Sequence, residues 1–482
     1  MPRPDALSLL QQLAANHFDR ERPVFFGAAH GCLDVLGALE AEGGGTLAQM
    51  TLPGGVAAAV QLRSDGTLRI KSAQISPPVG DAEVTFNLRD LEELAPVDAV
   101  RKIGQIAAGR ASWAAGLLAL FWLLKGQFKL AAGDGGANVL IHGDLPIGAG
   151  QASSTALLAA AARACMQARH VSLDIQSLAH TLATAEAYAG CAADHPQTPL
   201  PSRGHMIDAL TCLHPREPEP TLLRYSAQPH RFVGPVPLPE DVHIFALDTG
   251  VRYTSARSTL EELRVAAAMG LRIIETIYRD LGQHHTPLHG YLTNTSPLLY
   301  RQYFRTLLPK RLRGSDFVRT FGPLAGMDNG LHAAPLLTAE ELDSPRLYRV
   351  RTAVDHLIAE NEHAEQFVQA MEELADDSSG ISPMDAAERQ RTLQRAGRLL
   401  LASHHSYRLR LELSCREADC LVDSLMEAGP DKGIYGARIT GVGGGGTVVA
   451  LLQRSAPATD ALLQTLRAYH QMTGLTLGVT EV

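Results

Sequence analysis

The spacing of apolar residues predicts several β-strands along the chain. Val56–Leu62 and Leu68–Ser72 alternate between apolar and polar positions, as strands with one buried face do. The turn residues Ser64–Gly66 lie between these two segments and predict a β-hairpin. Asn138–Ile141 predicts a short strand, and Val242–Arg252 predicts a buried strand that ends in a turn.

Other segments carry the patterns of helices. Ala156–Ala168 is rich in alanine, which costs least in a helix, and contains no Gly or Pro. Ile175–Ala189 repeats its apolar residues at helical spacing, and Leu411–Met426 is expected to form a helix that includes Leu413. Ala111–Leu124 is strongly apolar but too short to span a bilayer, so we expect a buried helix and no membrane partner.

Composition narrows the class of protein. A chain of 482 residues predicts two or more domains with ample core. Hydrophobic residues make up 45% of the chain and charged residues 20%, as in ordinary globular proteins. The net charge of −8 argues against nucleic acid as a partner, because nucleic-acid binding needs a basic face. The six cysteines lack metal-ligand spacing and no secretory signal precedes them, so we expect reduced thiols and a cytoplasmic location.

A glycine-punctuated turn, Pro146–Ala156, joins the strand at Asn138–Ile141 to the alanine-rich helix. Unpaired backbone N–H groups and the positive dipole end at such a helix start form an anion site. Gly148 and Gly150 remove side chains that would keep a phosphate away from the backbone. Taken alone, the turn fits an ordinary Ser-capped helix equally well.

The same turn resembles the phosphate-binding motif of the GHMP small-molecule kinases, with Gln151 and Ala152 as departures from the family pattern. The resemblance implies that the loop wraps the phosphates of ATP and that Ser154 reaches a Mg²⁺ ion. It also implies that a glutamate from the following helix, Glu186 here, shares this ion; a lone helical glutamate is otherwise a surface residue. The ATP-binding residues implied are Gly148, Ala149, Gly150, Gln151, Ala152, Ser153 and Ser154.

Residues 29–50 resemble the first motif of the sugar-kinase branch of this family, the galactokinases and arabinokinases. Those enzymes carry an arginine where this chain has Cys32, and a thiol cannot replace the fixed cationic donors of a guanidinium. Arg252 and Arg203 are candidates to replace that cation, although surface ion pairs are the commoner fate of arginine. The side chains that could accept hydrogen bonds from substrate hydroxyls are Asp34, Glu40 and Glu42; the two glutamates are equally compatible with solvated loop carboxylates.

The segment His205–Thr211 resembles the family stretch that carries the catalytic aspartate, and Asp208 is the matching residue. A carboxylate beside a sugar's anomeric hydroxyl can accept its proton as the oxygen attacks the γ-phosphate. An aspartate at this point of the chain could also be a helix N-cap. The resemblance favours the catalytic role.

Five glycines lie between positions 441 and 446. They satisfy the dinucleotide-binding pattern G-x-G-x-x-G, but that motif requires a helix after the glycines, whereas β-branched residues follow here. We therefore expect strand–turn–strand, which resembles the third GHMP motif. Such a hairpin brings its backbone close to the phosphate loop and the substrate, so Gly443 and Gly444 are expected near the substrate.

The resemblance covers nearly the whole chain and implies an α+β, two-lobed GHMP kinase fold, with nucleotide and substrate in the cleft between the lobes. The expected domains are residues 1–225, with the phosphate loop and Asp208, and residues 226–482, with the glycine hairpin. The expected function is ATP-dependent phosphorylation of the anomeric hydroxyl of an aldose or uronic acid. Two alternatives stay open: a catalytically weak or inactive kinase-like sensor of sugar and nucleotide, and a kinase of a non-sugar alcohol. The sequence does not indicate the acceptor or the oligomeric state.

Overall fold

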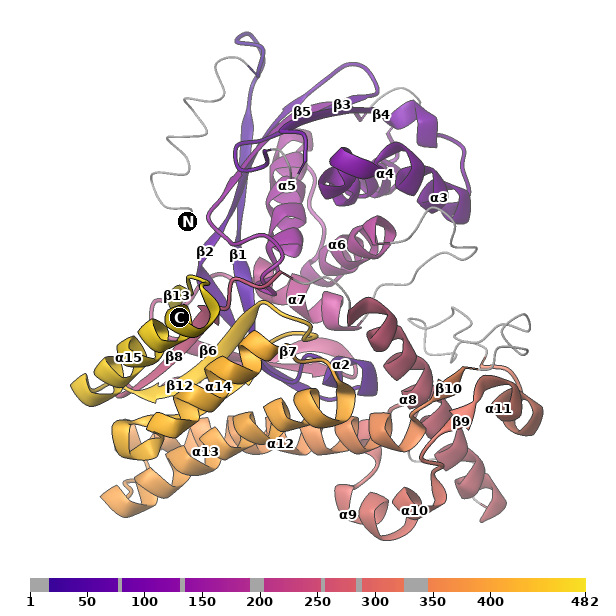
Figure 1. The fold of residues 1–482 in the computed structure, drawn as a ribbon. Helices are drawn as coiled ribbons and strands as arrows, with labels where there is room; N and C mark the ends of the chain where they lie inside the picture. The colour runs from indigo at the N-terminus through magenta and orange to yellow at the C-terminus, as the bar shows by residue number, and fades with distance from the viewer. Residues whose placement is uncertain are drawn as a thin grey trace. The chain divides into compact units, whose positions relative to one another are not determined.

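The computed structural model describes residues 17–76, 80–130, 135–190, 203–252, 256–282, 288–324 and 346–482 (Figure 1). The chain forms two compact units, and the segments that build them alternate along the sequence. The first unit is drawn from Met1–Cys32, Thr51–Ile147 and Ala152–Arg216; the second unit is drawn from Leu33–Met50, Gly148–Gln151 and Glu217–Val482.

The first unit is built on a mixed sheet in which the strands are ordered β4-β3-β5-β2 and β1 pairs with β2. The strands are β1 (Phe25–Leu36), β2 (Thr46–Leu62), β3 (Thr67–Ser72), β4 (Glu83–Asn87) and β5 (Ala137–Gly143). Its α-helices are α3 (Pro96–Ile106), α4 (Ala115–Gln127), α5 (Ser153–Arg169), α6 (Ile175–Ala189) and α7 (Arg203–Leu213). Helix α7 packs on both α5 and α6, so the three helices form one group.

The prediction of a β-hairpin at Ser64–Gly66 is wrong, although both predicted strands, β2 and β3, are present. Strand β5 lies between them: Val139 is opposite Val60 of β2 in antiparallel register and opposite Ile70 of β3 in parallel register. Strand β5 is buried along nearly its whole length, as is typical of a central strand. A turn signal cannot reveal that a distant apolar segment inserts between its two strands.

The apolar segment at Ala111–Leu124 forms a short 3₁₀ turn followed by α4, whose Leu117–Phe121 side chains are buried in the first unit. The expectation of a buried helix is therefore confirmed. In the described parts of the chain, no helix combines the length and apolar character needed to cross a bilayer.

The second unit contains a four-stranded antiparallel sheet in the order β11-β12-β8-β13. Its strands are β8 (Val242–Asp248), β11 (Ile434–Ile439), β12 (Thr447–Gln453) and β13 (Gly478–Glu481), and its long helices are α8 (Ala256–Asp280), α12 (Val350–Ser378), α13 (Ala386–Ser406), α14 (Arg416–Ala428) and α15 (Ala456–Thr473). Helices α13 and α14 pack on β11, and α12 packs on α13 and α8 (Figure 1).

Shorter elements complete the second unit. Strands β6 (Thr221–Ala227) and β7 (His230–Pro237) pair with each other, and β6 also pairs with Thr46–Gln49 of β2. The remaining short elements include α2 (Glu40–Gly43), α9 (Pro297–Leu299), α10 (Arg305–Leu307), β9 (Leu312–Arg313), α11 (Gly314–Phe321) and β10 (Leu347–Tyr348).

The predicted helix Leu411–Met426 begins five residues later than expected, at Arg416. A π-helical turn, Tyr407–Leu411, ends α13, and Glu412 then adopts a left-handed conformation with φ of 58°. Leu413 lies outside any helix because its backbone carbonyl binds the glycine hairpin. The carbonyl oxygen accepts a hydrogen bond of 2.7 Å from the Gly444 N–H.

A buried histidine in α12 makes the stability of this unit depend on pH. The His356 ring is 3% exposed and its Nδ1 lies 3.0 Å from the Ser406 hydroxyl. Burial lowers the pKa of His356 from 6.5 to about 4. Between these two pH values the unfolded chain binds more protons at this residue than the folded chain does, so stability is lost as pH falls through this range.

We expect the free energy of unfolding to fall by about 3 kcal/mol between pH 6.5 and pH 4 because of this residue alone. His356→Gln should flatten that part of the profile, measured by urea unfolding in small pH steps. His405→Gln, at an exposed position of the adjacent helix, is the matched control and should leave the slope unchanged. An unchanged slope in His356→Gln would contradict the assignment.

Candidate active site

The described residues of the first unit bring together two hydroxyls and the predicted metal-binding carboxylate. Ser154 lies in the first turn of α5, and its hydroxyl donates a hydrogen bond to Glu186 Oε1 from α6. Thr155 donates to the other carboxylate oxygen, Oε2, at 2.8 Å. The resemblance predicts that Ser154 and Glu186 share a Mg²⁺ ion; the two side chains lie together, and their role in binding a metal stays a prediction. Thr155 was not singled out, although a second hydroxyl in the same helical turn was a usable signal.

Asp208 is the sixth residue of α7 and therefore is not an N-cap. Its carboxylate is half-buried, and the Cys32 thiol lies 3.9 Å from Asp208 Oδ1. Cys32, the position at which the resemblance implies an arginine, is thus in contact with the predicted base. Cys32 is 2% exposed and is the last residue of the part of β1 that belongs to this unit.

Arg163 links the elements that carry these groups, and its role could not be predicted from a lone arginine in a helix. Its guanidinium, projecting from α5, donates to the Ala28 carbonyl of β1 and to the Leu213 carbonyl at the end of α7, each at 2.6 Å. A cation at a helix C-terminus also complements the helix dipole. Burial raises the pKa of the neighbouring Cys212 thiol, and the charges of Asp208 and Glu186 raise it further, so this thiol is inert.

In the second unit, the five glycines form the turn between β11 and β12, as predicted. All five have φ between 63° and 128°, the left-handed region that favours glycine. A Cβ on Gly443 would overlap the Leu413 carbonyl oxygen, and one on Gly446 would overlap the Ala149 carbonyl oxygen. The prediction of a strand–turn–strand hairpin is confirmed, and its glycines are required by close backbone approach.

The phosphate-loop residues 148–151 dock on this hairpin. The Thr447 hydroxyl donates to the Ala149 carbonyl at 2.8 Å, and Gln151 Nε2 donates to the same hydroxyl at 3.1 Å. Gln151, a departure from the family pattern, is buried here and helps to hold the loop. Gly150 has φ of 73° and open space where a side chain would point, which leaves its backbone accessible.

We expect Gly446→Ala to disrupt the docked loop, because the new methyl group would meet the Ala149 carbonyl. Gly282→Ala is the matched control: it imposes a similar left-handed strain, with φ of 83°, but has nothing within 4 Å of the new atom. The strain common to both costs roughly 1–2 kcal/mol. Thermal unfolding and ATP affinity should both fall further in Gly446→Ala; equal losses would contradict the packing described.

One of the two candidate cations lies beside this loop. Arg252 binds both carboxylate oxygens of Asp248, at 2.7 and 3.0 Å, and its Cδ lies 3.7 Å from the position that a Cβ of Gly148 would take. The side chain of the other candidate, Arg203, lies outside the described residues.

The predicted substrate carboxylates have different surroundings. Asp34 is buried, and its Oδ2 accepts hydrogen bonds from Arg438 Nη1 at 2.9 Å and from the Gly441 N–H at 3.3 Å. Glu42 forms an ion pair of 3.0 Å with Arg264. The Glu40 side chain lies outside the described residues.

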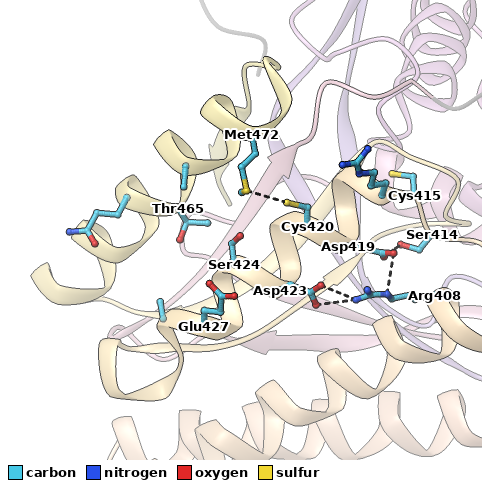
Figure 2. A pocket seen from close by; sticks show the side chains of 14 residues that line it. Arg408, Ser414, Cys415, Asp419, Cys420, Asp423, Ser424, Glu427, Thr465 and Met472 are labelled. Carbon is cyan, nitrogen blue, oxygen red and sulfur yellow. Dashed lines mark hydrogen bonds and ion pairs between the residues drawn. The ribbon is translucent and has the colours of Figure 1, made fainter.

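A cavity of about 870 Å³ lies between α14 and α15 and contains none of the predicted site residues (Figure 2). Figure 2 shows Arg408 paired with two of its acidic groups: Arg408 bonds to Asp423 at 3.0 Å and lies 3.2 Å from Asp419. The Cys420 and Met472 sulfur atoms are 4.0 Å apart at one side. We assign this cavity no part in the chemistry of the predicted residues.

Comparison with known proteins gives two matches to family models. The N-terminal domain of the GHMP kinases matches residues 117–198, and the C-terminal domain matches residues 384–470. The L-arabinokinase of Arabidopsis thaliana is 23% identical over 520 aligned residues, which cover 96% of this chain and 46% of the plant protein. The galactokinase of Bos taurus is 46% identical over 71 residues, 15% of this chain and 17% of that enzyme. The chain thus spans less than half the length of these relatives.

Two solved structures share the fold. Lactococcus lactis galactokinase in complex with galactose has a TM-score of 0.68 at 16% identity, with 98% of this chain and 97% of that one covered. L. major mevalonate kinase in complex with R-mevalonate has a TM-score of 0.51 at 15% identity, with 96% of each chain covered. The chain thus matches the N-terminal and C-terminal domain models of the GHMP kinases in order, and it shares the fold of Lactococcus lactis galactokinase.

Proposed function

We propose that the protein is an ATP-dependent kinase that phosphorylates the anomeric hydroxyl of an aldose or uronic acid. The observation that carries this proposal is the group formed by α5, α6 and α7 in the first unit. Ser154 and Thr155 of α5 donate hydrogen bonds to Glu186 of α6, and Asp208 lies on α7, which packs against both helices. The relatives named L-arabinokinase and galactokinase support a sugar as the acceptor.

The donor set suits Mg²⁺. Two hydroxyls already meet the Glu186 carboxylate, and oxygen is the ligand type that this hard cation requires. Within the described parts of the chain there is no cluster of three His, Cys, Asp or Glu side chains arranged to bind a metal. A Mg²⁺ ion held mainly by nucleotide phosphates needs only one or two protein oxygens. Ser154 and Glu186 would hold the ion, which would neutralise charge on the phosphates.

The remaining roles follow from the chemistry of each group. The left-handed glycines of residues 148–150 and the first N–H groups of α5 would bind phosphate oxygens. Asp208 would accept the proton of the attacking hydroxyl. Arg252, beside Gly148, would supply positive charge near the loop. Gly443 and Gly444 would bring bare backbone toward the substrate.

The test is turnover by the purified chain with ATP, Mg²⁺ and a panel of aldoses, uronic acids and non-sugar alcohols, followed by ADP release. Turnover with a sugar that disappears in Asp208→Asn supports the proposal. Turnover only with a non-sugar alcohol would show that the acceptor is such an alcohol and not an aldose or uronic acid. Failure to turn over any compound, despite ligand-dependent thermal stabilisation, would overturn the kinase in favour of a sensor.

The sensor is retained as a second candidate because of one contact. Cys32 lies 3.9 Å from Asp208 and replaces the arginine that the sugar kinases carry there. A thiol stabilises negative charge on a transferring phosphoryl group far less than a guanidinium does.

A further inference from the structure

We propose that the buried ion pair between Arg438 and Asp34 positions the glycine hairpin Gly441–Gly446, and through it the phosphate loop at residues 148–151. The proposal rests on the proposed function, because it assumes that the hairpin and the loop bind nucleotide. Asp34 would then be a positioning residue and would not contact the sugar. All the residues concerned belong to the second unit.

Arg438 is fully buried near the end of β11, and Ile439 and Thr440 separate it from the first glycine of the hairpin. Its Nη1 donates to Asp34 Oδ2 at 2.9 Å and to the Val35 carbonyl at 3.0 Å. Its guanidinium carbon lies 5.1 Å from the centre of the Tyr407 ring, and its Nη2 lies 3.8 Å from Glu360 Oε1. The guanidinium therefore joins β1, α12 and the π-helical turn to the strand that leads into the hairpin.

The partners of Arg438 also hold the first residues of the hairpin. Asp34 accepts from the Gly441 N–H at 3.3 Å, and its backbone carbonyl accepts from the Thr440 hydroxyl. The Tyr407 hydroxyl donates to the Gly441 carbonyl at 2.9 Å. Both the N–H and the C=O of Gly441 are thus bound by groups that contact Arg438.

The same framework reaches the rest of the hairpin. The Gly444 N–H donates to the Leu413 carbonyl at 2.7 Å, and the Leu413 N–H donates to the Tyr407 carbonyl at 2.9 Å. At the far end, Thr447 donates to Ala149 of the loop. A shift of Asp34 or Tyr407 would therefore move the backbone that supports the loop.

Stability alone is a weak explanation for this pair. Burying two charges carries a desolvation cost that their attraction does little more than offset, and apolar replacements of such pairs are often neutral. A fixed set of hydrogen bonds, by contrast, defines one geometry for a glycine turn that has little stiffness of its own. Burial lowers the pKa of Arg438, but Asp34, Tyr407 and Glu360 more than compensate and hold that pKa above its ordinary value.

The decisive variant is Tyr407→Phe, which removes the bond to Gly441 and keeps the ring beside Arg438. Tyr435→Phe is the matched control: Tyr435 is a buried tyrosine on β11, and its hydroxyl donates to Gln390 at 2.9 Å, away from the hairpin. The measurements are the Kd for ATP by calorimetry, the KM values for both substrates, and thermal unfolding without ligand. The two variants should lose similar stability.

We expect Tyr407→Phe to raise the Kd and KM for ATP by roughly two- to tenfold, the effect of one hydrogen bond. The Arg438→Met and Asp34→Leu double variant removes both charges of the pair and leaves Glu360 its hydrogen bond from the Ser403 hydroxyl; it should fold and should weaken ATP binding at least as much. Equal ATP affinity in Tyr407→Phe and Tyr435→Phe would overturn the positioning role. A wild-type chain that binds no ATP would overturn the proposed function itself.

Discussion

Asp208→Asn is expected to reduce kcat by about 100- to 10,000-fold, the usual contribution of a positioned general base. Asparagine has nearly the same shape as aspartate but cannot accept the proton of the attacking hydroxyl. Because Asp208 lies inside α7 and its side chain is only half-buried, the substitution should leave the helix intact. Initial rates of ADP release at saturating sugar and ATP measure the loss, and calorimetry shows whether ATP still binds.

Asp90→Asn is the control for this substitution. Asp90 is an exposed aspartate of the first unit in a short 3₁₀ turn, and the same change of charge there should alter kcat less than twofold. Activity in Asp208→Asn within twofold of wild type would show that another group takes the proton or that no base is needed.

The second large effect is expected for Glu186→Gln. The amide can still accept a hydrogen bond from one of the two hydroxyls, but it loses the negative charge that a Mg²⁺ ion requires. We expect a loss in kcat on the order of 100-fold or more, with half-maximal activity shifted to higher Mg²⁺. The measurement is a Mg²⁺ titration of ADP release at fixed ATP.

Glu21→Gln, at an exposed position of the first unit, supplies the matched control and should leave the Mg²⁺ titration unchanged. An unshifted titration in Glu186→Gln would remove this residue from the metal site. In that case its two hydrogen bonds would be purely structural, holding the start of α5 against α6.

Cys32 lies where the resemblance to the sugar kinases implies an arginine. The structure places its thiol against Asp208, so the substitution lies at the predicted chemistry and not at its edge. Arg252 belongs to the other unit and already binds Asp248 through both oxygens. The turnover experiment therefore decides between two alternatives. Either the protein is a kinase in which another group supplies the positive charge, or it is a sensor without turnover.

Local chemistry allowed several features to be predicted from the sequence. The β-branched residues after the glycines exclude a helix there, and the hairpin between β11 and β12 follows. The helical periodicity of Ile175–Ala189 matches α6 residue for residue. The family motif placed Ser154 near Glu186, because it records a three-dimensional arrangement in two short stretches of sequence; the metal-binding role of the two residues stays a prediction.

Other features depend on partners distant in the chain. Strand β5 separates β2 from β3 because its buried apolar residues need a neighbour on each side, which the intervening turn could not indicate. Leu413 leaves the expected helix because its carbonyl binds Gly444. The sequence by itself therefore determined most element types and supplied the candidate reactive side chains, whose roles stay predictions. The tertiary structure alone decided that Asp34 faces Arg438, 404 residues away, because a buried charge is defined by the partner that folding brings to it.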